Sequence, residues 1–460
     1  MRDQDLTEGP ISGHFRTLAV PAAMGMLFST LYNVVDIFYA GQLSTEAQAG
    51  LAIGFQAFFI MIAVGIGTGS AMSALVGNAR GRKSDADARR TAMQGLSFAI
   101  VAVGVLLVVG AIGGPQLIAL VSEPGGYRDA ANGYFFWLLA ALPGFVVAYA
   151  ANGILQAHGD SVTMQRAMMA AFVANIGLNP LFMYGIPELV PGLGFNGIAL
   201  STVVSQTGVM VFVLRAVLNL RVIKGAQLTE LTPKAADYRE IFWQMIPTSS
   251  ALILMFVSGF VVQFALKDFG EHAIAAYGIA LRIEQILLLP VLGMTGALLP
   301  IAAQNFGAGD FARVREAVWF CWKLGLVLTV GAAPVLWFGG GAAMSFFTDD
   351  QQVIAVGVSY LRVDSFLFVL YMMLFSINSL LQALKRPVWT LWISIYRQGF
   401  GVAFFVWLLV GVIGMDVWGV WLGIGLAVSS GWVIALVVAF RVAQQEIGGL
   451  RAGPSPVTAR

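Results

Sequence analysis

Charged side chains are scarce in this chain: Lys, Arg, Asp and Glu together make up 11% of its 460 residues. A single cysteine, Cys321, excludes an intramolecular disulfide. The three histidines, His14, His158 and His272, are scattered and form no His-Glu-x-x-His motif. No Gly-x-Ser-x-Gly lies between a strand and a helix, and no glycine-rich loop follows a strand. These absences argue against an intramembrane enzyme and against nucleotide binding, and they predict no cofactor and no metal.

Hydrophobic residues are abundant instead, at 58% of the chain, and the mean hydropathy is +0.81. Apolar runs of about 20 residues, long enough to cross a bilayer, alternate with short polar stretches, and we count about twelve. Residues 99–112 are continuously apolar, whereas a membrane β-barrel would alternate apolar and polar side chains. We therefore predict an all-α polytopic membrane protein. The first apolar run extends past the length of a signal-peptide core, so we expect the N-terminus to be retained.

The predicted spans fall into two sets of six. Their boundaries, which hydropathy places to within a few residues, are 15–42, 50–78, 91–113, 129–157, 161–186 and 194–222, then 239–267, 274–305, 312–340, 351–384, 388–414 and 418–445. Because each set has an even number of spans, both halves of the chain start and end on the same side of the membrane.

The second half of the chain repeats the first. Asn152-Gly-Ile-Leu-Gln-Ala157 returns 226 residues later as Asn378-Ser-Leu-Leu-Gln-Ala383. The same offset relates Pro21 to Pro247, Ala49 to Ala275, Tyr134 to Tyr360, Gly197 to Gly423, and Arg215 to Arg441. Two pseudo-symmetric six-helix bundles around a central cavity are the usual plan of a secondary transporter. We predict an amino-terminal lobe at 1–222, a cytoplasmic linker at 223–238, a carboxy-terminal lobe at 239–447 and a disordered tail at 448–460.

Basic side chains gather in alternate loops. They are Arg80, Arg82, Lys83, Arg89 and Arg90, then Arg215, Arg221, Lys224, Lys234 and Arg239, then Arg313, Arg315, Lys385 and Arg386. The intervening loops carry Glu46, Glu123, Glu188, Asp349, Asp350 and Asp416. By the positive-inside rule, both termini and the linker face the cytoplasm of a protein in the plasma (inner) membrane. The basic clusters are short and juxtamembrane, so they do not predict nucleic-acid binding.

A carboxylate within a spanning segment is costly, which makes Asp36 the leading candidate for a functional group. It lies about two turns from the outward end of the first span, and Tyr32, one turn earlier, shares its helical face. Asn175 and Asn179 repeat this spacing on the fifth span, and Pro180 frees a backbone carbonyl that could add an oxygen ligand. Together these groups could hold a cation. Alternatively, neighbouring hydroxyls satisfy the carboxylate and the amides join helices.

Four segments resemble the multidrug and toxic compound extrusion (MATE) transporters, and they cover essentially the whole chain in order. They are Tyr277-Gly-Ile-Ala-Leu-Arg-Ile-Glu-Gln285 continuing to Gly293–Asp310, Tyr32–Gly41 after Pro21, Asn175–Phe182, and Gly197–Gln206. The resemblance implies twelve helices in two bundles. It also implies export of organic, often cationic, molecules driven by inward flow of sodium ions or protons.

The resemblance further assigns a cation-linked network to the amino-terminal lobe. The matching positions are Asp36, Asn175, Asn179, Tyr32, Tyr134, Asn152 and Thr202. Among them, Asn152 lies nearer the cytoplasm than Asp36, and its repeat at Asn378 indicates a packing role common to both lobes.

The chain departs from the family pattern in both lobes. Many family members carry an aspartate where this chain has Asn179, so one carboxylate remains where they have two. Another branch binds sodium through acids on the seventh and tenth helices, where this chain has Met255 and about Tyr371. Asp364 lies nearly two turns from that second position and is not its equivalent in our alignment. The sequence thus gives little support to a second ion site, and we expect one monovalent cation per cycle at Asp36.

Four further residues are candidates for conformational change or substrate contact. Pro21 permits a bend in the first span, which the resemblance links to narrowing of the amino-terminal cavity; a static kink is the alternative. Met24 and Met168 could give a substrate cavity a pliable lining, although methionine also fills ordinary cores. Glu284 would either assist a cationic substrate or pair with another helix.

Together, the residues and the resemblance predict an antiporter, coupled to H+ or Na+, that exports organic, multidrug-type cations by alternating access and thereby confers antibiotic resistance. We expect small organic substrates, a bilayer environment and a monomer. A flippase for lipid-linked precursors is one alternative, but it would need a strongly basic cavity, and the spans contain few basic residues. An intramembrane enzyme and a channel are alternatives from other classes, and the two-lobe repeat fits alternating access better than a channel.

Overall fold

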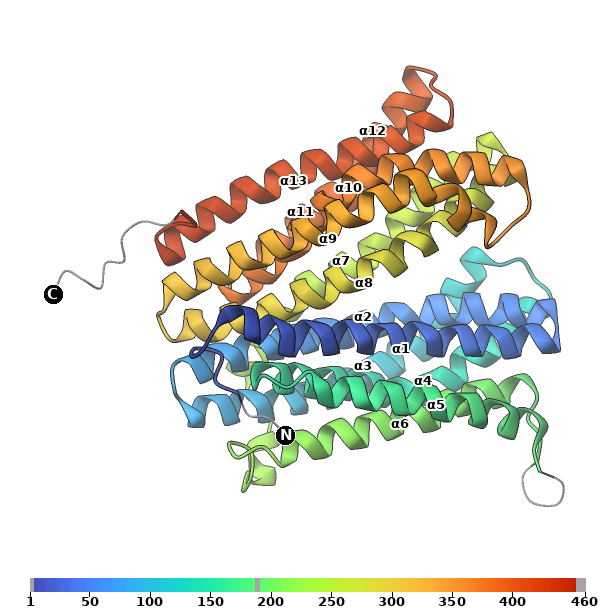
Figure 1. The fold of residues 1–460 in the computed structure, drawn as a ribbon. Coiled ribbons are helices and arrows are strands. Elements are labelled where there is room, and N and C mark those ends of the chain that lie inside the picture. Colours follow the sequence, from blue (N-terminus) through green and yellow to red (C-terminus); the bar gives the residue numbers. More distant parts are fainter. Residues whose placement is uncertain (1–3, 187–190, 452–460) are drawn as a thin grey trace. The chain divides into compact units, whose positions relative to one another are not determined.

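A computed structural model describes residues 4–186 and 191–451, and the elements in these ranges are helices. In order (Figure 1) they are α1 Ile11–Leu43, α2 Thr45–Gly81, α3 Asp85–Val121, α4 Gly126–Ala157, α5 Val162–Tyr184, α6 Phe195–Leu218, η1 Leu228–Leu231, α7 Ala235–Leu266, η2 Lys267–Phe269, α8 Glu271–Gly307, α9 Phe311–Ser345, α10 Gln351–Ala383, α11 Val388–Ser394, η3 Ile395–Gly401, α12 Val402–Val406, η4 Trp407–Val412 and α13 Val417–Ile447. Twelve segments of the described chain are long and apolar enough to span a membrane, which confirms the predicted all-α polytopic fold. Glu188 and the tail beyond Arg451 lie outside the described residues.

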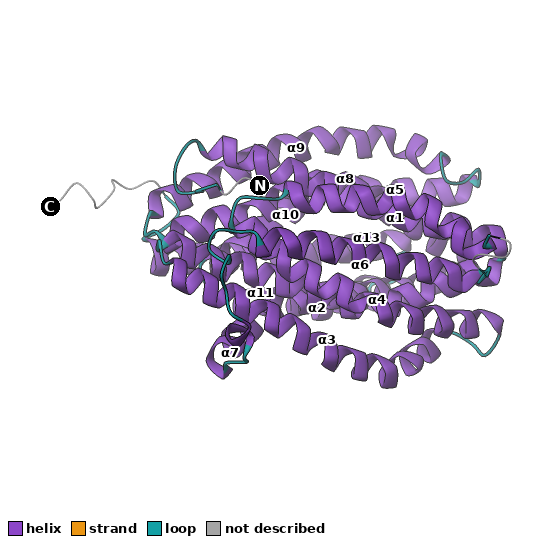
Figure 2. Ribbon diagram, turned by 90° about the horizontal axis from the view of Figure 1, so that it is seen from below, coloured by secondary structure: helices purple, strands orange, loops and turns teal. Residues whose placement is uncertain are grey.

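Most of the spanning helices, drawn in purple in Figure 2, extend beyond the apolar runs that predict them, whereas α5, α6, α10 and the eleventh span are slightly shorter. Hydropathy predicts a span at 91–113, whereas α3 covers Asp85–Val121. Polar caps explain the extension at the helix starts. The Ser84 hydroxyl accepts the backbone N–H of Asp87 at 3.3 Å, and the Ser44 hydroxyl accepts that of Ala47 at 3.0 Å. Since such a cap stabilises a helix by about 1 kcal/mol, helices begin in polar sequence before the apolar run.

The eleventh span, Val388–Val412, contains two π-helical stretches, η3 and η4. A π-helical turn accommodates an additional residue and often occurs at functional sites. Hydropathy does not distinguish a π-helix from an α-helix, so the sequence predicts only a span at 388–414.

The chain forms two compact units. Unit 1 comprises Met1–Asp5 and Met24–Ser249, and unit 2 comprises Leu6–Ala23 and Ser250–Arg460. Consequently α1 begins in unit 2 and ends in unit 1, whereas α7 begins in unit 1 and ends in unit 2. Each helix changes unit two residues after one of the repeated prolines at positions 21 and 247. Unit 1 therefore corresponds to the first half of the sequence with the start of α7 in place of the start of α1. Unit 2 corresponds to the second half with the start of α1 in place of the start of α7.

In unit 1, glycines allow α2 and α4 to pack closely. A Cβ atom added to Gly69 would lie 2.6 Å from the carbonyl oxygen of Tyr149. One added to Gly54 would lie 2.8 Å from the carbonyl oxygen of Ala131. Small residues at such contacts let membrane helices gain van der Waals energy from close backbone approach. The glycines of α2 thus have a packing role.

In unit 2, the end of α8 holds the segment that precedes α1. Asn305 donates from Nδ2 to the carbonyl of Leu6 at 3.1 Å, and the Leu6 N–H donates to Oε1 of Gln304 at 2.9 Å. Arg313 of α9 donates from Nε to Oδ1 of Asn305 at 3.0 Å. The Gln304-Asn305 pair, which the sequence identifies only as part of a family motif, therefore anchors the N-terminal segment.

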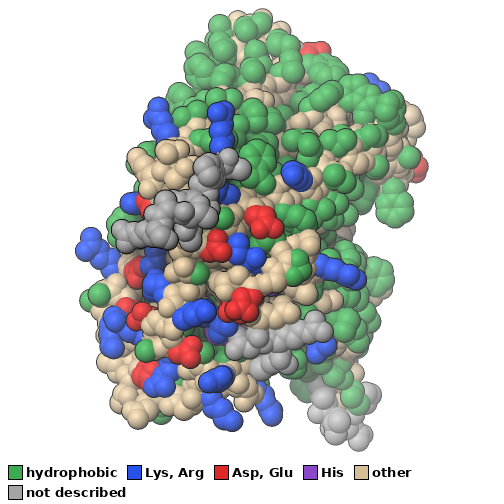
Figure 3. Space-filling view, turned by 60° about the vertical axis from the view of Figure 1, so that its left-hand side comes forward, with side chains coloured by type: hydrophobic (Ala, Val, Ile, Leu, Met, Phe, Trp, Pro, Cys, Tyr) green, Lys and Arg blue, Asp and Glu red, His purple; other side chains and the backbone are tan. Residues whose placement is uncertain are grey.

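Charged side chains gather at one end of the helices, as Figure 3 shows, whereas hydrophobic side chains cover the helix flanks. In unit 1 this end includes the α6–α7 linker, which is held against α3. Gln94 donates from Nε2 to the carbonyls of Glu230 and Thr232, at 2.7 and 2.9 Å, and accepts the Lys234 N–H at 3.0 Å. The Arg89 guanidinium forms an ion pair with the Glu230 carboxylate. The linker is therefore an ordered part of unit 1.

The Arg89–Glu230 pair should persist well below neutral pH. Hydrogen bonds from Arg89 and from the Gln227 backbone lower the pKa of Glu230 from 4.5 to about 2. Because the folded-state pKa is depressed, the pair contributes stability above pH 4.5 and loses it as pH falls towards 2. We expect the Glu230→Gln variant to melt below wild type by an amount that is constant at pH 5–7 and shrinks towards pH 3. An equal difference at every pH would contradict this assignment.

Candidate functional site

The predicted cation-linked residues of unit 1 surround Asp36, which is 3% exposed. Asn175 and Asn179 donate from Nδ2 to its Oδ1 at 2.9 and 2.8 Å. Thr202 donates from Oγ1 to its Oδ2 at 3.3 Å. Both amides donate to Oδ1, whereas Oδ2 faces a hydroxyl that can either donate or accept, so the cluster can hold the carboxyl in its ionised or its protonated form.

Two helices supply these donors by simple spacing. Asn175 and Asn179 are one turn apart on α5, so both amides share a face, and Asn179 also donates to Oδ1 of Asn175 at 3.2 Å. On α6, Ser201 accepts from Nδ2 of Asn175 at 3.3 Å. Asp36 itself comes from the part of α1 that belongs to unit 1. Three helices of one unit therefore converge on a single carboxylate.

Tyrosines extend the cluster. The Tyr32 hydroxyl donates to Oγ1 of Thr202 and to Oγ of Ser205, both at 3.2 Å. Tyr134 of α4 is 1% exposed, and its hydroxyl lies near Asp36 and Thr202. Sequence reasoning missed Ser201 and Ser205 as site residues. Their spacing on the Gly197–Gln206 segment, with Thr202 between them, was the signal that could have found them.

One acceptor in the cluster is unused. Oδ1 of Asn179 is buried and accepts no hydrogen bond from any described residue. Carboxylate and amide oxygens are the usual ligands of hard cations. Asp36 and Asn179 together therefore offer a proton or an alkali cation the oxygens it would need.

Asn152 does not join this cluster. It lies on α4, where its Oδ1 is buried and accepts no hydrogen bond from the described part of the chain. Its repeat on α10, Asn378, has the same unpartnered Oδ1. The two repeated positions therefore leave the same atom without a hydrogen bond, and Asn152 takes no part in the hydrogen bonds of Asp36.

A family model, MatE, matches residues 21–181 and 247–407. The two matches are related by the same 226-residue offset as the sequence repeat. Together they cover more than half of the chain. The chain belongs to the MATE family. Its members are transporters and not enzymes, and this protein is accordingly a multi-pass membrane transporter of the multidrug efflux type, as predicted.

Individual relatives agree with this assignment. A probable multidrug resistance protein, YoeA, of Bacillus subtilis is 25% identical over 88% of each chain. A FAD transporter of Shewanella oneidensis is 24% identical over 76% of this chain and 78% of its own. A solved structure described as the outward-facing conformation of a multidrug resistance MATE family transporter superposes with a TM-score of 0.89, covering 98% of this chain and 99% of that one at 22% identity. The last likeness confirms the MATE fold.

Unit 2 of this MATE transporter contains a second buried acidic cluster. The Tyr360 hydroxyl donates to Oε2 of Glu284 at 2.7 Å, so α8 and α10 are joined here. Asp364, one turn after Tyr360, is fully buried, and neither of its carboxylate oxygens accepts a hydrogen bond from a described residue. It interacts electrostatically with Glu284. An uncompensated buried carboxylate is expensive, so this pair is a candidate for cation binding in its own right.

The cluster around Glu284 also contains a cation. Arg397, in the π-helical stretch η3, interacts electrostatically with Glu284. With both carboxyls ionised, two carboxylates and one guanidinium would leave one negative charge, which a proton or a monovalent cation would neutralise. Among the positions compared with the sodium-binding branch, Met255 is 43% exposed and Tyr371 is buried.

The remaining candidates lie apart from Asp36 in the chain. Pro21 lies inside a continuous helix, α1. Close to Pro21 in the sequence, Ala19 packs against α8, because a Cβ added to Gly293 would lie 2.7 Å from the carbonyl oxygen of Ala19. Met168 belongs to the buried core of unit 1, and Met24 is half-buried. In the described residues, no group of three or more His, Cys, Asp or Glu side chains could hold a metal ion.

Proposed function

We propose that this MATE transporter is an antiporter in which Asp36 binds one monovalent cation, H+ or Na+, and exchanges it for an organic substrate. The observation that carries the proposal is the single buried carboxylate surrounded by donors from α5 and α6. A carboxylate within the membrane that is surrounded by polar hydrogen-bond partners is typical of an ion pathway. We also propose, from the positive-inside rule, that the protein lies in the plasma membrane with both termini in the cytoplasm.

Binding of either cation requires the cluster to rearrange. A proton on Asp36 turns one carboxylate oxygen into a donor, and the unused Oδ1 of Asn179 is an acceptor within the same cluster. A sodium ion needs oxygens alone, so the amides that now point Nδ2 at Asp36 would rotate to present Oδ1. In either case the hydrogen bonds that join α1 to α5 and α6 change with ion binding, and the packing of these helices changes with them.

We propose small organic cations as substrates, in line with the multidrug transporters among the relatives. A flavin nucleotide is a second candidate, because one relative is named a FAD transporter. The observation that favours this candidate is Arg282, an exposed guanidinium within the spanning helix α8. Such a charge rarely faces lipid and often contacts an ionic substrate.

Proteoliposomes test the coupling directly. A cationic dye and a flavin nucleotide would each be followed under a sodium gradient at fixed pH, and under a pH gradient without sodium. If only one of the two gradients drives transport, that gradient identifies the coupling ion. The compound that is transported, dye or flavin nucleotide, identifies the substrate class. Transport that needs ATP and neither gradient would refute the antiporter mechanism.

We also propose that Glu284 and Asp364 hold a second monovalent cation or a shared proton. Replacing Asp364 by asparagine removes a buried carboxyl group whose two oxygens accept no hydrogen bond from a described residue. In sodium-free buffer we therefore expect the free energy of unfolding of the variant to be about 1–3 kcal/mol larger than that of wild type. Thermal unfolding with and without sodium measures this effect. Wild type should gain stability from the cation, whereas the Asp364→Asn variant should gain less.

Glu284→Gln is the matched variant, because Glu284 already accepts the Tyr360 hydroxyl. Its gain in sodium-free buffer should be smaller than that of Asp364→Asn. A destabilised Asp364→Asn protein would contradict the proposed second site.

A further inference from the structure

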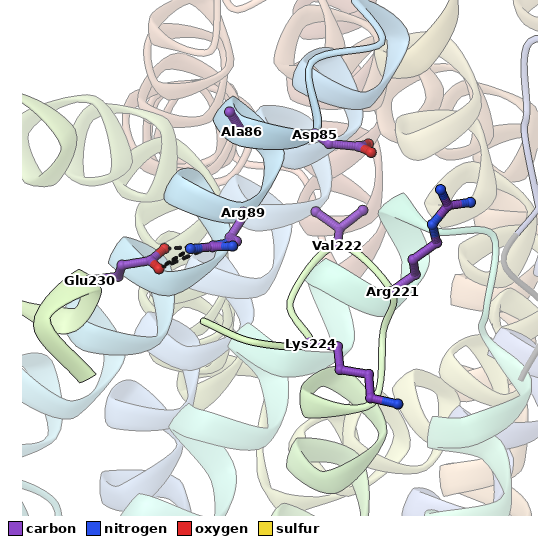
Figure 4. Close-up of a pocket in the computed structure, with 7 residues that line it drawn as sticks. All are labelled: Asp85, Ala86, Arg89, Arg221, Val222, Lys224 and Glu230. Atoms are coloured by element: carbon purple, nitrogen blue, oxygen red, sulfur yellow. Dashed lines mark hydrogen bonds and ion pairs between the residues drawn. The ribbon is translucent and has the colours of Figure 1, made fainter. Parts of the chain in front are cut away.

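Unit 1 contains a charged pocket (Figure 4), and none of the residues that line it belongs to the Asp36 cluster. Its volume is about 540 Å³, within the range of roughly 300–1,000 Å³ that small-molecule sites occupy. It is lined by Asp85, Ala86, Arg89, Arg221, Val222, Lys224 and Glu230. The first three residues come from the first turns of α3, and the other four come from the α6–α7 linker.

The lining contains cations without counter-charges. Arg89 is engaged by Glu230, and Figure 4 shows this pair on one wall of the pocket. Arg221 and Lys224 are exposed, and neither forms an ion pair or a side-chain hydrogen bond with any described residue. Asp85 is the remaining charge. Three cations against two carboxylates leave the pocket one net positive charge. Because Arg89 and Glu230 neutralise each other, this excess comes from Arg221 and Lys224 against the single carboxylate of Asp85.

The position of the pocket indicates what the charge is for. Arg221 and Lys224 follow the last residue of α6 by three and six residues, and α3 begins at Asp85. The pocket therefore lies at the end of one membrane-spanning helix, α6, and at the start of another, α3. Basic pockets at the ends of spanning helices are suited to phosphate groups, because a guanidinium binds phosphate oxygens in pairs and an ammonium adds a point charge.

We propose that this pocket binds a phosphate group through Arg221 and Lys224. The phosphate would be either the phosphodiester of an anionic phospholipid or free inorganic phosphate. Bound there, it would join the linker to the start of α3 beside the Arg89–Glu230 pair, and would hold the linker more firmly on unit 1. This site does not depend on the identity of the transported substrate or of the coupling ion.

Thermal unfolding of the full-length protein in detergent tests the site. Phosphatidylglycerol, phosphatidylcholine and inorganic phosphate would be titrated separately against wild type. We expect the unfolding temperature to rise with phosphatidylglycerol if the site takes a lipid, or with inorganic phosphate if it takes the free anion. Phosphatidylcholine should have a smaller effect than phosphatidylglycerol, because its choline ammonium offsets the charge of its phosphodiester. A response to neither anion would overturn the proposal.

The double variant Arg221→Gln/Lys224→Gln should lose at least half of the rise. The matched control is Arg215→Gln/Arg239→Gln, which removes two exposed juxtamembrane cations that do not line the pocket. It should respond as wild type does. Equal losses in both double variants would show a general effect of surface charge and would overturn the site.

Native mass spectrometry provides a second measurement that does not rely on unfolding. The number of phosphatidylglycerol molecules or phosphate ions retained should fall by one in the pocket variant and not in the control. The single variant Lys224→Gln, with intermediate retention, covers the case in which the double variant is not stable. Unchanged retention in Lys224→Gln would overturn the role of Lys224. Since retention is measured without a gradient, its failure is distinguishable from failure of the antiport mechanism.

Discussion

Asp36→Asn should abolish gradient-driven transport while leaving the protein folded. The amide is close in shape to the carboxylate, but it carries no charge to attract a cation and cannot be protonated in the required range. Uphill transport in proteoliposomes should therefore fall to the level of protein-free vesicles. The three donors that now face Asp36 would lose a charged acceptor, although Asn175, Asn179 and Thr202 have other partners nearby.

The control for Asp36 is Asp268→Asn, which neutralises an exposed carboxylate in η2. It should transport at the wild-type rate. Elution as a single species in size-exclusion chromatography establishes that both variants are folded. If Asp36→Asn pumps uphill at full rate under the same gradient, the coupling mechanism proposed for Asp36 is wrong.

Gly69→Ala should strongly destabilise the protein. The added methyl group would lie 2.6 Å from the carbonyl oxygen of Tyr149 and 3.1 Å from its carbonyl carbon, both of which are backbone atoms. A side chain could rotate away, but here α2 and α4 must separate. Overpacking of this kind costs about 1–3 kcal/mol, and contact with backbone favours the upper end. We expect a clear fall in the unfolding temperature and in the yield of folded protein.

Gly104→Ala is the matched control, because Gly104 also lies within a spanning helix, α3, and nothing lies within 4 Å of a Cβ added there. Alanine is the better helix former, so this variant should be as stable as wild type or slightly more stable. If the two variants melt at the same temperature, the α2–α4 contact is not as close as the structure indicates.

Much of the fold is predictable from the sequence because hydropathy and repetition are strong signals. The number of spans, their order and the two-fold repeat all follow from apolar runs and from one offset. The extent of each helix is less predictable, because capping by residues such as Ser44 and Ser84 extends helices into polar sequence. The exchange of the first parts of α1 and α7 depends on tertiary packing and has no signal in hydropathy.

The candidate site shows the same division. Asp36, Asn175, Asn179, Thr202 and Tyr32 are brought together in unit 1, because the i, i+4 spacing on helices predicts a shared face. The contact between Tyr360 and Glu284 joins two helices that are far apart in the sequence, so no local pattern predicts it. The unpartnered oxygens of Asp364 are likewise a property of its surroundings.

The exchanged helix segments have a consequence for dissecting the protein. A break in the linker would yield an amino-terminal fragment that lacks the start of α7 and keeps the start of α1, which belongs to the other unit. The carboxy-terminal fragment would have the reverse defect. Neither fragment would contain a whole compact unit, and each would carry the start of a helix that packs within the unit formed mainly by the other fragment. Split versions of the protein should therefore mature only when both pieces are made in the same membrane.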